Sequence, residues 1–146
     1  MAMLPFCGYN MADYFGHWLT LGAKADVAKL PRVFYVNWFR KDDDGAFMWP
    51  GYGENSRVLE WIFRRCENET DALQTPLGLV PHAGDLNTDG LDLNAATLEA
   101  LITVDEAAVA AELPQIEAHL ATFGDDLPPQ VRAQFEALKE RLGAAV

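Results

Sequence analysis

The chain has 146 residues, of which half are apolar and 23 % are charged, a composition typical of a globular domain. Its net charge of −11 is unevenly spread, because residues 66–131 contain thirteen acidic side chains and no Lys or Arg. Such an acidic half repels a phosphate backbone, and no apolar run approaches the ~20 residues of a membrane span. We therefore expect no nucleic-acid partner, no membrane partner and a cytoplasmic protein in which Cys7 and Cys66 are free thiols.

The N-terminal third predicts one helix and one strand. Apolar residues between Met11 and Leu19 recur at helical spacing, with Asn10 as the expected N-cap and Gly22 near the expected end. The continuous apolar run at residues 33–36, Val-Phe-Tyr-Val, predicts a strand buried on both faces, as in an α/β sheet.

A second helix is predicted to end at Cys66, with Asn55 or Ser56 as its N-cap. Its expected apolar stripe contains Val58, Ile62 and Cys66, flanked by Leu59 and Phe63. The segment that follows is rich in turn-forming residues, and residues 78–80 are a candidate for a short strand.

Three helices are predicted to close the chain. The first covers residues 95–102, and Asp105 caps a longer one that Pro114 should break or kink. Pro128 and Pro129 open the last helix. Its expected buried face consists of Val131, Phe135, Leu138 and Leu142.

Residues 37–57 are the most informative part of the chain. They place five large aromatic side chains in a predicted loop: Trp38, Phe39, Phe47, Trp49 and Tyr52. Loops lie on the surface and cannot bury such rings, so a flat apolar ligand is expected between them. A nucleotide base fits this expectation because every base has a π-face that stacks on aromatic rings.

Within this aromatic loop, Phe39, Phe47 and Tyr52 are the candidate walls of a base-binding slot. Gly51 and Gly53 would allow close backbone approach, and the Asn55 amide has the donor and acceptor needed to recognise a purine edge. The other interpretation is a hydrophobic cluster pinned under the loop, with Asn55 only capping the following helix.

Two acidic segments are candidates for cation sites. The pattern Asp85-x-Asn87-x-Asp89-Gly90 begins like an EF-hand calcium loop, but Ala96 stands where the bidentate Glu should be. The run Asp42–Asp44 before a glycine predicts a turn. The sequence contains neither a nucleophile elbow nor a phosphate loop, and we assign no catalytic or metal-binding residue.

Residues 37–42 (Asn-Trp-Phe-Arg-Lys-Asp) and 47–59 (Phe-Met-Trp-Pro-Gly-Tyr-Gly-Glu-Asn-Ser-Arg-Val-Leu) closely resemble the C-terminal part of GTP-dependent phosphoenolpyruvate carboxykinase. Similar matches occur at residues 5–10 (Pro-Phe-Cys-Gly-Tyr-Asn), 75–81 and 89–91, so the resemblance covers almost the whole chain. It implies an α/β fold in which residues 1–146 are the C-terminal part of the GTP-binding domain, with mixed-sheet strands followed by a helical C-terminal region.

The resemblance also implies a function. Enzymes of this family convert oxaloacetate and GTP to phosphoenolpyruvate, GDP and CO₂ in gluconeogenesis, with manganese and magnesium. The implied guanine-site residues are Trp38, Phe39, Phe47, Tyr52, Gly53, Glu54 and Asn55. Phe6 would lie near the oxaloacetate pocket, and Tyr52 stands where many relatives have Phe, which preserves the ring.

The family's phosphate loop and metal ligands lie N-terminal to the matched part. We therefore expect a fragment that is inactive alone and whose partners are the nucleotide, oxaloacetate or phosphoenolpyruvate, and the missing N-terminal part. The complete enzyme is expected to be monomeric. The alternatives are a non-catalytic calcium-binding or acidic interaction module built on Asp85–Asp92, and a folded remnant with no ligand.

Overall fold

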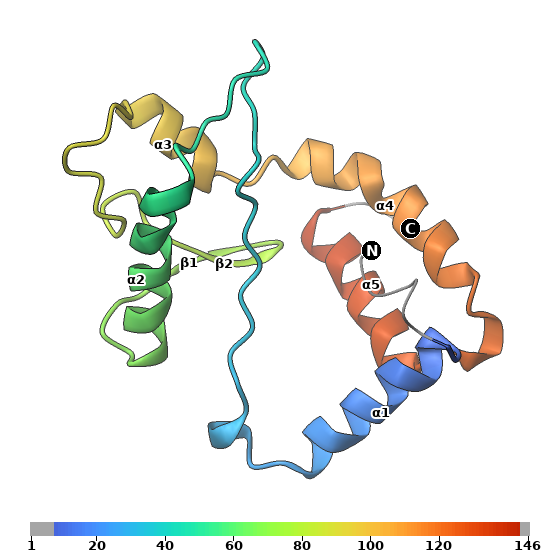
Figure 1. Ribbon diagram of the computed structural model, residues 1–146. Coiled ribbons are helices and arrows are strands. Elements are labelled where there is room, and N and C mark those ends of the chain that lie inside the picture. The colour runs from blue at the N-terminus through green and yellow to red at the C-terminus, as the bar shows by residue number, and fades with distance from the viewer. Residues whose placement is uncertain (1–7, 144–146) are drawn as a thin grey trace. The chain divides into compact units, whose positions relative to one another are not determined.

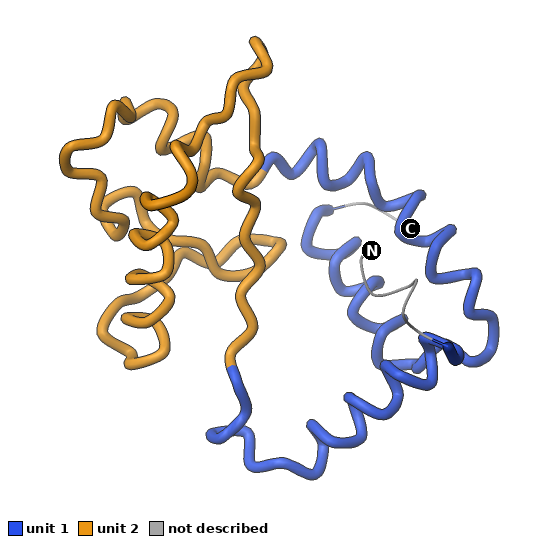
Figure 2. Tube along the Cα trace, viewed as in Figure 1, with its two compact units in different colours: residues 1–31, 105–146 blue, residues 32–104 orange. Residues whose placement is uncertain are grey.

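The structure, a computed structural model, describes residues 8–143. Its regular elements in chain order are α1 (Met11–Lys24), α2 (Asn55–Cys66), β1 (Leu73–Thr75), β2 (Gly78–Val80), α3 (Ala95–Ile102), α4 (Glu106–Ala121) and α5 (Pro129–Arg141) (Figure 1). The chain forms two compact units, one made of Met1–Pro31 with Asp105–Val146 and the other of Arg32–Val104 (Figure 2). No helix within the described range has the length and apolarity needed to span a membrane.

The first unit consists of three helices whose predicted starts are confirmed. The Oδ1 atom of Asn10 accepts a hydrogen bond from the Ala12 amide over 2.9 Å, and Asp105 Oδ1 accepts one from the Ala108 amide over 2.9 Å. Pro129 is at the start of α5, as expected. These caps satisfy amide groups that lack partners within the helix.

Of the break or kink predicted at Pro114, the break is wrong, because α4 runs from Glu106 to Ala121 without interruption. Proline removes one backbone hydrogen bond from a helix interior. Its neighbour Leu113 is buried in the core of the unit, and packing of this kind outweighs local helix propensity.

The core of the first unit is apolar and aromatic. Its buried members are Met11, Ala12, Leu113, Leu127 and Phe135. The rings of Phe15 and Phe123 meet edge-on with centroids 6.2 Å apart, which joins α1 to the chain after α4. Lys139 of α5 lies 3.8 Å from Glu117 of α4 and 5.1 Å from the centre of the Phe135 ring.

The second unit lacks the strand predicted at residues 33–36. This segment has no ladder partner among the described residues, and Val33 and Tyr35 are 91 % and 96 % exposed. A strand requires a neighbouring backbone that accepts and donates its hydrogen bonds, so an apolar run alone does not make one. The predicted strand at residues 78–80 is confirmed as β2, which pairs antiparallel with β1. The sheet within the described range consists of these two strands.

Helix α2 ends at Cys66 as predicted, but its buried face differs from the expected stripe. Trp61 is the buried residue of α2, and it meets the Phe34 ring edge-on at 6.2 Å. Leu59 and Phe63 are 46 % and 69 % exposed, and Cys66 is a free, exposed thiol. Cys7 lies outside the described residues. Residues 58–63 of this helix are apolar except for Glu60, so their periodicity does not reveal which side is packed.

Candidate functional site

The aromatic loop is built on a tight reversal of the chain between Arg40 and Met48. The Met48 amide donates a hydrogen bond to the Arg40 carbonyl over 3.0 Å, and the Asp42 amide donates one to the Ala46 carbonyl over 3.0 Å. The Asp42 carboxylate accepts from the Ala46 amide at 2.8 Å, and Gly45 takes a φ of +82°. The predicted turn at Asp42–Asp44 is thereby confirmed, and the backbone of the loop is ordered.

This reversal brings Phe39 and Phe47 together. Their ring centroids are 6.1 Å apart with an interplanar angle of 61°, and the rings are 72 % and 59 % exposed. The Lys41 ammonium lies 5.0 Å from the centre of the Phe47 ring. The expected slot residues therefore form an exposed, edge-on aromatic pair with a cation beside it.

Tyr52 stands apart from this pair. It is 98 % exposed, and among the described rings it contacts neither Phe39 nor Phe47. Its φ of +46° lies in the left-handed region, which is uncommon for a residue other than glycine. The preceding Gly51 has a φ of +75°. Burial of these rings in a hydrophobic cluster under the loop is therefore wrong for this chain.

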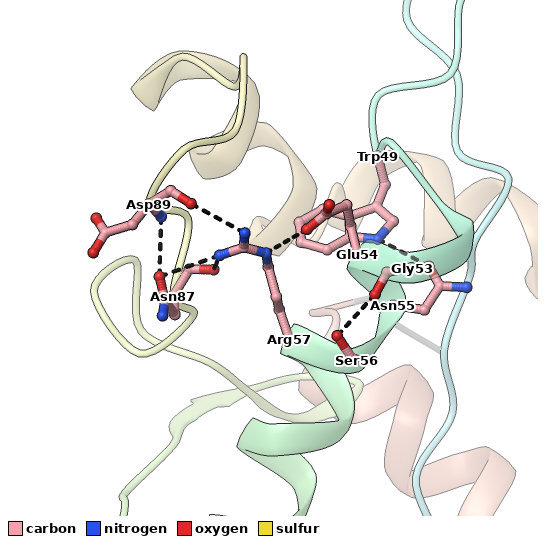
Figure 3. Close-up of polar contacts among 8 residues, drawn as sticks. All are labelled: Trp49, Gly53, Glu54, Asn55, Ser56, Arg57, Asn87 and Asp89. Atoms are coloured by element: carbon pink, nitrogen blue, oxygen red, sulfur yellow. Dashed lines mark hydrogen bonds and ion pairs between the residues drawn. The ribbon is translucent and has the colours of Figure 1, made fainter.

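The buried side chain of Trp49 and the half-buried side chain of Asn55 anchor the loop. Trp49 is only 6 % exposed, and its Nε1–H donates to Asn55 Oδ1 over 3.0 Å (Figure 3). Asn55 is the first residue of α2, and Glu54 occupies the N-cap position without a side-chain cap. The expectation that Asn55 or Ser56 caps this helix is therefore wrong. The Ser56 hydroxyl donates instead to the Gly53 carbonyl over 2.8 Å.

Arg57, in the first turn of α2, has a structural role that was not predicted from the sequence. Its Nε donates to the Glu54 carboxylate over 2.5 Å, and its Nη1 and Nη2 donate to the carbonyls of Asn87 and Asp89 over 2.9 and 3.0 Å (Figure 3). Arginine presents several donors in a rigid planar fork, so one side chain fixes both segments. The sequence gives no local signal for these contacts, because Asn87 and Asp89 lie 30 and 32 residues beyond Arg57.

The same contacts leave the calcium alternative without support. In the Asp85–Asp92 loop, the carbonyls of Asn87 and Asp89 accept hydrogen bonds from the Arg57 guanidinium, and Asp85 Oδ2 accepts from the His82 amide over 2.9 Å. Among residues 8–143, no group of three His, Cys, Asp or Glu side chains could hold a metal ion.

The remaining expected site residues fall in different places. Trp38, which precedes Phe39 in the sequence, is half-buried. Phe6 lies outside the described residues. Arg40, at the base of the reversal, donates to the carbonyls of Leu101 and Thr103 over 3.3 and 3.4 Å. The loop is thus tied to the end of α3 as well as to α2.

The chain is thus a mixed α and β domain segment. Its aromatic loop exposes Phe39, Phe47 and Tyr52 to solvent. Residues 1–141 match the sequence model described as the phosphoenolpyruvate carboxykinase C-terminal P-loop domain, and the chain belongs to this family. The resemblance drawn from the sequence is therefore confirmed.

Relatives with the name phosphoenolpyruvate carboxykinase [GTP] agree with this assignment. The chain is 53 % identical to the Neocallimastix frontalis protein over 146 residues, and 50 % identical to that of Treponema pallidum (strain Nichols) over 145. It is 47 % identical to that of Paenarthrobacter aurescens (strain TC1) over 143 residues. These matches cover 98–99 % of this chain but only 24 % of each relative.

Proposed function

We propose that residues 37–57 form the guanine-recognising wall of the GTP site in a GTP-dependent phosphoenolpyruvate carboxykinase. The complete enzyme would convert oxaloacetate and GTP to phosphoenolpyruvate, GDP and CO₂. The observation that carries the proposal is the solvent exposure of Phe39, Phe47 and Tyr52 on an ordered loop. The names of the relatives supply GTP as the nucleotide.

Exposed aromatic rings suit a base because each base has a π-face, and stacking contributes roughly 1–3 kcal/mol per base. The hydrogen bonds around Asp42 and the Trp49–Asn55 contact order the backbone before any ligand arrives. An ordered loop loses less conformational entropy when it binds, so preorganisation of this kind favours affinity.

The remaining roles follow from position. Asn55 would hydrogen-bond the base edge, Trp38 would pack behind the slot, and Gly53 and Glu54 would shape the bend beneath it. Phe6 would lie near oxaloacetate. The cation of Lys41 beside Phe47 suits the neighbourhood of a small anionic ligand.

In this proposal the groups that carry out phosphoryl transfer lie in the rest of the enzyme, outside this chain. Phosphoryl transfer relies on positioning and on charge neutralisation by metal, Lys and Arg groups. The described residues contain no group suited to manganese or magnesium, so we assign no metal ligand and derive no step through a metal. The chain alone is expected not to form phosphoenolpyruvate. The complete enzyme would be a cytoplasmic monomer.

Equilibrium titration of GTP into this chain tests the slot. Phe47→Ala should weaken GTP binding by roughly 5- to 150-fold, which corresponds to the loss of one stack. The matched control is Phe63→Ala, because Phe63 is 69 % exposed in the same unit but lies on α2, outside the loop. Equal losses from both variants, or no GTP binding by the unmodified chain, would contradict the proposed function.

A further inference from the structure

The buried indole of Trp49 determines how the Asn55 side chain is oriented. Indole Nε1–H is a donor and never an acceptor. Its 3.0 Å contact with Asn55 must therefore be made to the amide oxygen, as Figure 3 shows. Rotating the amide by half a turn would place the Nδ2 donor against the indole donor. Because Trp49 is only 6 % exposed, the indole could not recover the lost bond from bulk water.

With the oxygen held in this way, the amide presents a defined pattern to a ligand. In Figure 3 the Asn55 amide nitrogen points away from the indole, and within the described range no residue accepts a hydrogen bond from it. The nitrogen thus has two donors available, and the oxygen keeps a second lone pair. The outward pattern is a donor beside an acceptor in one fixed order.

The two purines differ in the pattern that they require. Guanine presents the acceptor O6 beside the donor N1–H, whereas adenine presents the donor N6–H₂ beside the acceptor N1. An amide held as in this structure can donate to O6 and accept from N1–H. The opposite amide orientation would match adenine. The orientation of one amide is therefore sufficient to distinguish the two bases.

We infer that Trp49 is a positioning residue that sets the preference for guanine over adenine by locking the amide of Asn55. This inference rests on the proposed function, in which Asn55 meets the edge of the base. It assigns Trp49 no contact with the nucleotide. Its role is exerted through a single hydrogen bond.

The decisive variant is Trp49→Phe, which keeps an aromatic ring in the core but removes the N–H. A matched control exists in the same unit. Trp61 is also buried, at 5 % exposure, but its Nε1 has no hydrogen-bond partner among the described residues. Trp61→Phe therefore removes the same group from a similar environment without touching Asn55. A second replacement of Trp49, with β-(3-benzothienyl)alanine, substitutes sulfur for N–H and retains the bicyclic shape.

Binding of GTP, ITP and ATP to the full 146-residue chain is measured for each protein, with a circular-dichroism melt of the same samples. In the unmodified chain GTP and ITP, which share O6 and N1–H, should bind more tightly than ATP. In Trp49→Phe and in the benzothienyl variant the ratio of GTP to ATP affinity should fall about tenfold, or 1.4 kcal/mol. Trp61→Phe should leave this ratio unchanged.

Three results would overturn the inference: an unchanged ratio in both Trp49 variants, equal weakening of GTP and ATP, or the same change in Trp61→Phe. Asn55→Asp separates this failure from that of the proposed function. The carboxylate can still accept from Trp49 but cannot donate to O6, so it should lower the GTP-to-ATP ratio by itself. If Asn55→Asp lowers the GTP-to-ATP affinity ratio and the Trp49 variants do not, the result supports the guanine site and contradicts the role of Trp49.

Discussion

The packed rings around α5 and the rings of the aromatic loop differ sharply in their exposure to solvent. In the unit that contains α1, α4 and α5, Phe135 is 7 % exposed and Phe15 packs edge-on against Phe123. In the unit of residues 32–104, Phe47 and Tyr52 are 59 % and 98 % exposed although their backbone is ordered by hydrogen bonds. The packed rings around α5 thus stabilise their unit, whereas Phe47 and Tyr52 of the aromatic loop remain available to a partner.

This difference separates two kinds of aromatic residue that look alike in the sequence. A ring buried on folding contributes to the free energy of unfolding, whereas an exposed ring contributes only when something covers it. Substitutions of buried and of exposed rings should therefore affect different measurements. The free energy of unfolding should report on buried rings such as Phe135, and nucleotide binding on the exposed rings of the aromatic loop.

The largest effect is expected for Phe135→Ala. Truncating a buried Phe removes its transfer free energy and leaves a cavity, which lowers the free energy of unfolding by about 3–5 kcal/mol. Urea unfolding followed by circular dichroism measures the change. The GTP affinity of the folded fraction should be unaltered. A loss of affinity there would contradict the conclusion that Phe135 contributes to stability and not to nucleotide binding.

Tyr52→Ala should show the opposite profile. We expect the GTP Michaelis constant to rise roughly 5- to 150-fold, equivalent to ~1–3 kcal/mol of stacking, while the melting temperature changes little. The assay uses a chimera in which this chain replaces the matching 24 % of the Neocallimastix frontalis relative. Turnover at saturating GTP should fall much less, since base contacts act equally in the ground and transition states. A variant that melts early yet binds GTP normally would assign Tyr52 to the core.

Trp49 sharpens the comparison because it is a buried ring within the exposed loop. Asn55→Ala leaves the buried indole N–H without its acceptor, which should lower the free energy of unfolding by about 1–3 kcal/mol. The same substitution in a Trp49→Phe background should be less costly, because no donor remains to be satisfied. A double-mutant cycle of unfolding free energies measures this coupling, and strictly additive effects would argue against it.

The smallest effect is expected for Tyr52→Phe. Stacking depends on the ring, and the hydroxyl of a side chain that is 98 % exposed has no described partner to lose. GTP affinity and melting temperature should both stay within error of the unmodified protein. A marked loss of GTP affinity would show instead that the hydroxyl itself contacts the ligand.

Features encoded locally were predictable from the sequence. Asn10 and Asp105 accept hydrogen bonds from amides two and three residues ahead, so the start of each helix depends on a few neighbouring residues. The turn at Asp42–Asp44 is local for the same reason. The grouping of Phe39 with Phe47 followed once that turn was recognised.

Features that depend on distant partners were not predictable in this way. The run at residues 33–36 has the composition of a strand but has no ladder partner among the described residues. The exposed side of α2 could not be chosen, because Leu59, Trp61 and Phe63 are all apolar. The contact of Asn55 with Trp49 is not evident from local pattern, because it depends on the burial of Trp49, which is a tertiary property.

Arg57 holds the loop at residues 87–89 through a covalently attached cation, unlike a bound metal ion, which can dissociate. A bound ion leaves when its free concentration drops below its Kd, whereas a guanidinium carried by α2 has a fixed effective concentration. The order of this loop is therefore insensitive to dilution and to chelators. It depends instead on the placement of α2, because Arg57 lies in the first turn of that helix and holds the loop through its guanidinium.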